Sequence, residues 1–209
     1  MQYAMQLLVR DIRGSSLEEL AGILNERLAN DGNTFADNDG FRLHGTNRRQ
    51  VHRLLARMTH YVELHSGRKN SRYEDYAKRS GKGGYQIEHI WANHPQRHED
   101  EFDDPNDFDQ YRNRIGGLVL LPNSVNASFG DNSYREKLDY YYGENLLAQS
   151  LNEKAYKHDP GFSRFLEESR LPFRPHPKFR RDDLESRQEL YRKIAERIWN
   201  PQVLLRESE

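Results

Sequence analysis

Two short apolar runs are the clearest β-strand signals in this chain, and the sequence around them is patterned as helix or loop. The first run, Tyr85-Gln-Ile-Glu-His-Ile-Trp91, is rich in aromatic and β-branched residues and follows a glycine-rich break at 80–84. The second run, Leu118-Val-Leu-Leu121, is entered through Gly116-Gly117. A helix is predicted over roughly 132–142. The order strand, long loop, strand, helix predicts an α+β fold with a small two-stranded unit set in a mostly helical domain.

Apolar residues at helical spacing predict three longer helices. One covers 16–29, with Ser15 or Ser16 as its cap, a second runs from about Asn47 to His65, and a third from Asp182 to Trp199. The chain is polar, with 35% hydrophobic and 31% charged residues, but its 12 Tyr, 9 Phe and 2 Trp can still build a core.

Three segments are predicted to lack regular structure. The acidic stretch 98–109 is expected to be a solvated loop, because its spacing does not fit an EF-hand. Phe35 to Leu43 is expected to form a loop or a short hairpin. The basic connector 171–181 has two interpretations that stay open: it tracks a DNA backbone through its arginines, or it docks on the core through its aromatic residues.

The 209 residues are expected to form one domain, with a helical part at 1–80, the two-stranded core at 84–142 and a helical part at 143–209. The absence of cysteine excludes disulfides and thiolate metal sites. No signal peptide and no apolar run of membrane-spanning length is found, so we expect a cytoplasmic protein without a membrane partner. The net charge of −1 argues neither for nor against nucleic acid.

Glu88 and His89 are the residues in this unit that favour hydrolytic chemistry. They lie side by side near the end of the first strand, where a bend can bring both to one centre, and Asn126 follows the second strand. Phosphodiester hydrolysis needs a base for water and a hard cation held by oxygen ligands. A histidine with a near-neutral pKa serves as base, and one Glu with one Asn can hold Mg²⁺.

The motifs around these residues resemble a known nuclease family. Tyr85-Gln-Ile-Glu-His-Ile, then Arg112-Asn-Arg-Ile-Gly-Gly-Leu-Val-Leu-Leu-Pro122, then Asn126-Ala-Ser-Phe-Gly-Asp-Asn-Ser-Tyr-Arg-Glu-Lys137 is similar to the C-terminal nuclease domain of the GmrSD family. That family comprises modification-dependent restriction enzymes. The resemblance is dense over 85–142 and looser on both flanks.

The resemblance implies a ββα-metal (HNH) core and cleavage or nicking of double-stranded DNA with Mg²⁺ or Mn²⁺, in anti-phage restriction. It also implies an N-terminal NTPase and modification-sensing domain in the same protein, of which this chain would be the C-terminal fragment. By position, the family pattern makes His89 the general base, Glu88 and Asn126 the metal ligands, and Lys137 a helical lysine that contacts DNA near the phosphate.

One position departs from the family pattern. The usual Gly-Asn-Leu reads Gly116-Gly117-Leu118, so the asparagine that braces the base-bearing loop in HNH sites is missing. Asn113 is the first candidate to replace it.

The polar residues near the strands admit other interpretations. Asn126 could only cap a helix, and Asn123 is its rival as ligand. His94 and His98 could form a zinc site with His89, although loop polarity explains them better, and His94 is the preferred accessory residue. Arg97, Arg112 and Arg114 are candidate phosphate contacts because they lie near the presumed metal. A catalytically inactive DNA-binding or assembly module remains the alternative function.

Overall fold

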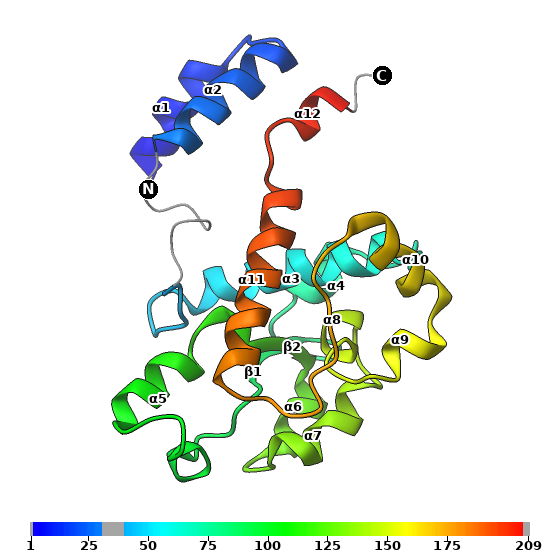
Figure 1. Ribbon diagram of the computed structural model, residues 1–209. Helices are drawn as coiled ribbons and strands as arrows, with labels where there is room; N and C mark the ends of the chain where they lie inside the picture. The colour runs from blue at the N-terminus through cyan, green and yellow to red at the C-terminus, as the bar shows by residue number, and fades with distance from the viewer. Residues whose placement is uncertain (1, 31–39, 207–209) are drawn as a thin grey trace. The chain divides into compact units, whose positions relative to one another are not determined.

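The computed structural model describes residues 2–30 and 40–206, and it divides into two compact units (Figure 1). One unit contains residues up to 39 together with 195 onward, and the other contains Gly40–Ile194. The loop or hairpin predicted from Phe35 therefore lies largely outside the described residues.

The smaller unit is helical. It contains α1 (Gln2–Ile12), α2 (Leu17–Ala29) and α12 (Val203–Arg206), and α12 packs against α2. Ser16 caps α2: its hydroxyl accepts from the Glu19 N–H while the Glu19 carboxylate accepts from the Ser16 N–H. This reciprocal pair is a capping box, so the predicted helix start is confirmed.

The larger unit surrounds two strands with helices. Its elements are α3 (Arg48–His65), α4 (Tyr73–Ala77), β1 (Tyr85–His89), the 3-10 turn η1 (Pro95–His98), α5 (Pro105–Arg112), the 3-10 turn η2 (Ile115–Gly117), β2 (Leu118–Pro122), α6 (Asn123–Phe129), α7 (Tyr134–Tyr141), α8 (Leu146–Gln149), α9 (Ala155–His158), α10 (Pro160–Ser169) and most of α11 (Arg181–Ile198). The expected mixture of helices with a small sheet is confirmed. No helix in the described part of the chain has the length and apolarity needed to cross a membrane.

The two strands pair antiparallel in a register that fixes the site. Tyr85 lies opposite Pro122, and His89 lies opposite Leu118. Helices α3 and α8 contact β2, and α6 contacts both strands. Because side chains alternate across a strand, Glu88 and His89 leave β1 on opposite faces.

An aromatic cluster forms the core beside the sheet. Trp91 stacks on Phe108 with ring centroids 5.8 Å apart, and its indole N–H donates to the Phe179 carbonyl at 2.8 Å. The same buried cluster also contains Ile90, Phe102, Val119, Leu121, Phe129, Tyr141, Ala148, Leu151 and Leu184. Aromatic residues therefore supply much of the buried area, as the composition predicts.

The acidic stretch is not a loop throughout, so that prediction is wrong for its second half. Residues 105–112 form α5, whose first turn is capped by the Asp104 carboxylate accepting from the Asn106 N–H. Pro105 occupies the first helical position, where its missing N–H costs nothing. The capping signal Asp104-Pro105 outweighs the local acidity.

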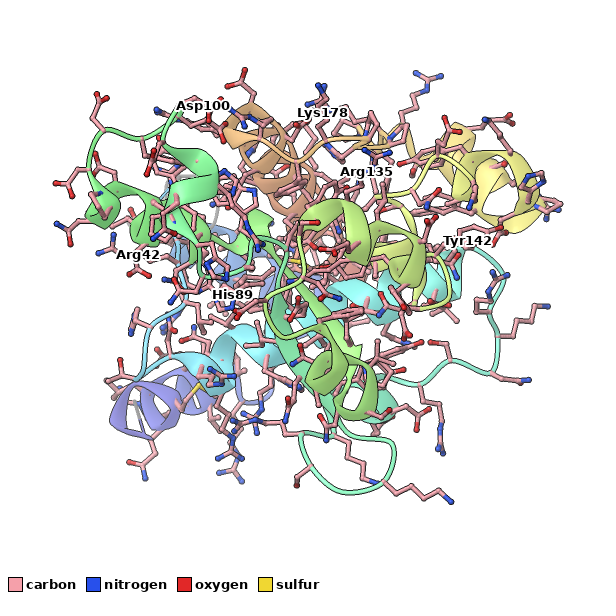
Figure 2. The ribbon with its side chains drawn as sticks, turned by 90° about the horizontal axis from the view of Figure 1, so that it is seen from below. Arg42, His89, Asp100, Arg135, Tyr142 and Lys178 are labelled. Atoms are coloured by element: carbon pink, nitrogen blue, oxygen red, sulfur yellow. The ribbon has the colours of Figure 1, made fainter. Side chains whose placement is uncertain are left out.

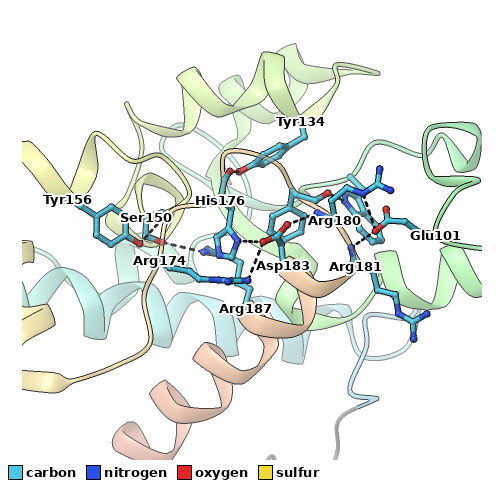
Figure 3. Close-up of polar contacts among 12 residues, drawn as sticks. Glu101, Tyr134, Ser150, Tyr156, Arg174, His176, Arg180, Arg181, Asp183 and Arg187 are labelled. Carbon is cyan, nitrogen blue, oxygen red and sulfur yellow. Dashed lines mark hydrogen bonds and ion pairs between the residues drawn. The ribbon is translucent and has the colours of Figure 1, made fainter.

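The connector before α11 docks on the core, which agrees with the second of its two interpretations (Figure 3). Phe179 is buried, and Asp183 of α11 accepts from His176 Nδ1 at 2.9 Å and pairs with Arg174 at 3.2 Å. Arg180 pairs with Glu101 at 3.2 Å. Burial lowers the pKa of His176 to about 4, so its imidazole is uncharged at neutral pH. Its Nδ1–H donates to the Asp183 carboxylate.

Candidate active site

His89 ends β1, half-buried, and is held by the end of α5. Its Nε2 lies 2.9 Å from Asn113 Oδ1, and Asn113 is the residue directly after α5. The amide of Asn113 is oriented by Asp109, because its Nδ2 donates to the Asp109 carbonyl at 2.8 Å and carboxylate at 3.2 Å. Asn113 therefore presents its oxygen to the imidazole. The structure therefore places Asn113, the candidate replacement for the family asparagine, against the His89 side chain, and its bracing role stays a prediction.

This hydrogen bond selects one tautomer of His89. A carbonyl oxygen can only accept, so Nε2 carries the proton and Nδ1 keeps its lone pair. Burial, followed by the nearby Arg112 guanidinium, lowers the pKa of His89 to about 4. The imidazole is consequently neutral at pH 7, with Nδ1 as its proton-accepting atom.

Glu88 points to the other face of β1 and meets a buried lysine. Lys137 of α7 is 2% exposed, and its Nζ donates to Glu88 Oε1 at 2.6 Å and to the His89 carbonyl at 3.0 Å. Burial raises the pKa of Glu88, while Lys137 and then Arg112 act in the opposite direction. One ammonium thus holds both residues of the Glu-His pair in place.

The placement of Lys137 bears on its predicted DNA contact. A direct contact with a phosphate would require the ammonium to leave Glu88 and reach the surface. In the structure Lys137 instead donates to the Glu88 carboxylate and to the His89 carbonyl, and the DNA contact stays a prediction.

Asn126 lies inside α6 and contacts β1. Its Nδ2 donates to Gln86 Oε1 at 3.1 Å, and Gln86 shares a strand face with Glu88. This contact uses the amide nitrogen, and the Lys137 contact uses Glu88 Oε1. Asn123, the rival, begins α6 with its Oδ1 buried and without a hydrogen-bond partner. The structure therefore brings Asn126 to Gln86, whereas Glu88 and His89 leave β1 on opposite faces, contrary to the expected bend that would bring both to one centre. Among the described residues no hydrogen bond or ion pair joins Glu88, His89 and Asn126 to one another.

Gly117 stands where the family pattern has asparagine, and both glycines of the Gly116-Gly117 pair pack against α11. A Cβ on Gly116 would lie 2.5 Å from the Leu184 carbonyl oxygen and 2.6 Å from the Gln188 nitrogen. A Cβ on Gly117 would lie 3.1 Å from both the Arg112 carbonyl oxygen and the Leu184 side chain. An asparagine at 117 would thus require its neighbours to move, and the bracing contact comes from Asn113 instead.

The three arginines expected near the site have different surroundings. Arg112 is half-buried, with Nε donating to the Trp91 carbonyl at 3.0 Å, and burial lowers its pKa. Arg114 lies over the Tyr111 ring, 3.8 Å from its centroid. Arg97 donates to the Asp131 carbonyl at 2.9 Å. Only Arg112 is close enough to shift the pKa values of both Glu88 and His89.

The histidines after β1 turn away from His89. His98 stacks against Trp91 with centroids 4.4 Å apart and contacts Glu101 at 2.9 Å, while His94 Nε2 lies 3.2 Å from Asp131. Within the described residues, no three His, Cys, Asp or Glu side chains are grouped to hold a metal ion. The geometry gives the three-histidine zinc site no support.

Replacing Asn113 with alanine is expected to slow DNA cleavage about tenfold to a hundredfold, because the hydrogen bond fixing the His89 tautomer is lost. Single-turnover rates on a short duplex would measure this. Asn106→Ala, at an exposed site on α5, is the matched control. An Asn113→Ala rate equal to that of the control would mean that this bond does not orient the base.

Comparison with known protein families identifies the chain. Residues 28–207 match the family of GmrSD restriction endonucleases, C-terminal domain. The chain belongs to this family. The GmrSD match spans most of the sequence and supports a restriction endonuclease role for the chain. Searches of curated proteins and of solved structures returned no significant match.

Sequence reasoning missed the surroundings of this GmrSD-type site on the His89 face of β1. His89 shares a pocket of about 420 Å³ with Arg42, His44, Arg48 and Asn113. In Figure 2, Arg42 and His89 lie near each other. A partial signal existed, because Arg48 and His52 are four residues apart in a predicted helix and must share its face.

Proposed function

We propose that the chain is a metal-dependent DNA endonuclease of the HNH type, with His89 as general base, acting in restriction of phage DNA. The observation that carries the proposal is the His89–Asn113 hydrogen bond. It leaves Nδ1 of a neutral imidazole available at the end of a strand whose sequence matches a nuclease family. A positioned base of this kind contributes about a hundred- to ten-thousand-fold in rate.

The chemistry of the donor atoms fits a hard divalent cation. Glu88, Gln86 and Asn126 offer one carboxylate and two amides; the Lys137 contact uses Glu88 Oε1, and the Gln86 contact uses the amide nitrogen of Asn126. We propose that Glu88 and Asn126 hold Mg²⁺, or Mn²⁺ in its place. Bound there, the cation would neutralise charge developing on the scissile phosphate.

The residues of the chain then perform three tasks. His89 Nδ1 takes a proton from water, and the resulting hydroxide attacks phosphorus as the bond to the 3′-oxygen breaks, leaving a 5′-phosphate. Asn113 keeps the tautomer correct for this transfer. Lys137 fixes the Glu88 carboxylate and the His89 backbone, so we assign it a positioning role.

Chelation tests the proposal. Supercoiled plasmid incubated with the chain and Mg²⁺ is expected to become nicked or linear, EDTA should abolish the reaction, and added Mn²⁺ should restore it. Cleavage at the same rate in EDTA would refute metal dependence.

The family description as a C-terminal domain also supports an N-terminal domain as partner. We propose that this partner is a sensing and NTPase domain.

The pH dependence provides a separate expectation. A pKa of about 4 keeps His89 neutral as the pH falls, so the single-turnover rate should stay nearly constant between about pH 5 and pH 7. An imidazole with the ordinary pKa would instead lose activity about tenfold per pH unit below about 6.5. A profile of the second kind, measured with saturating enzyme, would contradict the description of His89.

A catalytically inactive DNA-binding module is the second candidate function. The Lys137 ammonium on Glu88 favours it, because a cation already neutralises the proposed ligand. This candidate predicts DNA binding without cleavage at any Mg²⁺ concentration.

A further inference from the structure

The face of β1 that carries His89 is bordered by a row of basic side chains. Two pockets lie beside β1, one of about 420 Å³ at His89 and one of about 320 Å³ at Tyr85, Gln86 and Ile87. We call their basic lining residues the basic tract: Arg42 and His44 at the first pocket, His52 and Arg79 at the second, and Arg48 at both. All lie in the larger unit.

Backbone pairing holds one end of the basic tract beside the active site. Residues 41–43 run antiparallel to 113–115, with the Leu43 N–H donating to the Asn113 carbonyl at 2.7 Å and Arg42 opposite Arg114. Arg42 donates to the neutral Gln110 side chain at 2.7 Å, so its charge is retained. The same backbone that carries Asn113 therefore positions Arg42.

Helix α3 supplies the centre of the tract. Arg48 and His52 lie one turn apart on the helix face that meets β1, and His52 Nε2 contacts the Tyr85 carbonyl at 2.9 Å. Burial lowers the pKa of His52, and Arg48 contributes to lowering the pKa values of both His52 and His89. Arg48 is thus close to the imidazole in each pocket, and His52 lines the second pocket.

The arginines of the tract form no ion pair among the described residues. Across residues 2–30 and 40–206, no ion pair joins Arg42, Arg48 or Arg79 to a carboxylate, and all three side chains are exposed. Asp109 is the single carboxylate lining either pocket, so the positive side chains of the lining outnumber the negative one. Exposed guanidinium groups around concave sites are suited to bidentate binding of phosphate.

We propose that the basic tract binds the DNA backbone across the active site, with phosphates on both sides of the scissile bond seated in the two pockets and Arg48 between them. This inference rests on the proposed endonuclease function and names the residues that hold its substrate. It differs from the sequence-based set of Arg97, Arg112 and Arg114, which are engaged by protein groups.

Binding measurements without cleavage test the tract. Fluorescence anisotropy of a labelled duplex would be followed over a range of salt concentrations, in EDTA, for the whole chain and for Arg48→Ala and Arg79→Ala. Each variant should weaken binding about fivefold to twentyfold and reduce the slope of log affinity against log salt by about 1, because one phosphate contact is lost. Arg53→Ala is the matched control, since Arg53 is exposed on α3 but lines neither pocket.

The outcomes separate the tract from the nuclease proposal. Equal affinities and slopes for Arg48→Ala, Arg79→Ala and wild type would overturn the tract, as would an equal loss in Arg53→Ala. If wild type cleaves plasmid while the arginine variants bind normally, only the tract fails. If wild type never cleaves but Arg48→Ala loses binding as described, the tract stands and the endonuclease function fails.

Discussion

His89→Ala is expected to lower the single-turnover rate of DNA cleavage by about a hundred- to ten-thousand-fold, the range that a positioned general base contributes. The reason is specific to Nδ1: Nε2 is bound to Asn113, so no other nitrogen of the ring can take the proton from water. Rates would be measured on a short duplex with enzyme in excess, so that weaker binding does not enter the comparison.

Two controls accompany this variant. His158→Ala removes an exposed histidine at the end of α9 and should cleave like wild type. Thermal unfolding of His89→Ala should show that the fold persists, because the side chain is only half-buried. A folded His89→Ala protein that cleaves within about tenfold of wild type would remove His89 from the role of base.

Lys137→Met should produce the largest loss of stability, about 3–5 kcal/mol in the free energy of unfolding, because a buried carboxylate loses its partner. Lys137 and Glu88 are both almost fully buried and joined at 2.6 Å. Chemical denaturation would measure the change.

A surface pair supplies the matched control for Lys137. Lys154→Met breaks an exposed pair with Asp139, and should cost at most about 1 kcal/mol. Combining Lys137→Met with Glu88→Gln removes the uncompensated charge and should restore part of the lost stability. If Lys137→Met is no more destabilising than Lys154→Met, the buried pair does not hold the site.

The local parts of the site could be predicted from the sequence. Strand alternation, the glycine break and the dipeptide itself located Glu88 and His89, and the missing family asparagine directed attention to Asn113. The strand and turn signals depend on residues within a few positions of one another, so they can be read locally, whereas the roles of Glu88, His89 and Asn113 stay predictions. The capping serine of α2 was predictable for the same reason.

Long-range packing could not be predicted in this way. Lysine is normally exposed, so the burial of Lys137 against Glu88 depends on how α7 crosses the sheet. The contact between Gly116 and α11 joins residues about seventy positions apart, which no local pattern reveals. The basic tract likewise draws on residues 42, 48 and 79, which only the fold brings together.

The acidic stretch shows how one local signal can hide another. Its carboxylates suggested a solvated loop, but Asp104 and Pro105 are favourable residues for a helix start. The resulting helix α5 carries Asp109 and ends at Asn113. Missing this helix therefore meant missing the reason that Asn113 faces His89 with its oxygen.

The most direct measurement is an end-point assay on supercoiled plasmid with Mg²⁺, comparing wild type and His89→Ala at equal, high protein concentration. We predict that wild type converts the plasmid to nicked or linear DNA and that His89→Ala leaves it supercoiled. The result that would contradict the account is the same plasmid topology with both proteins, whether both cleave it or neither does.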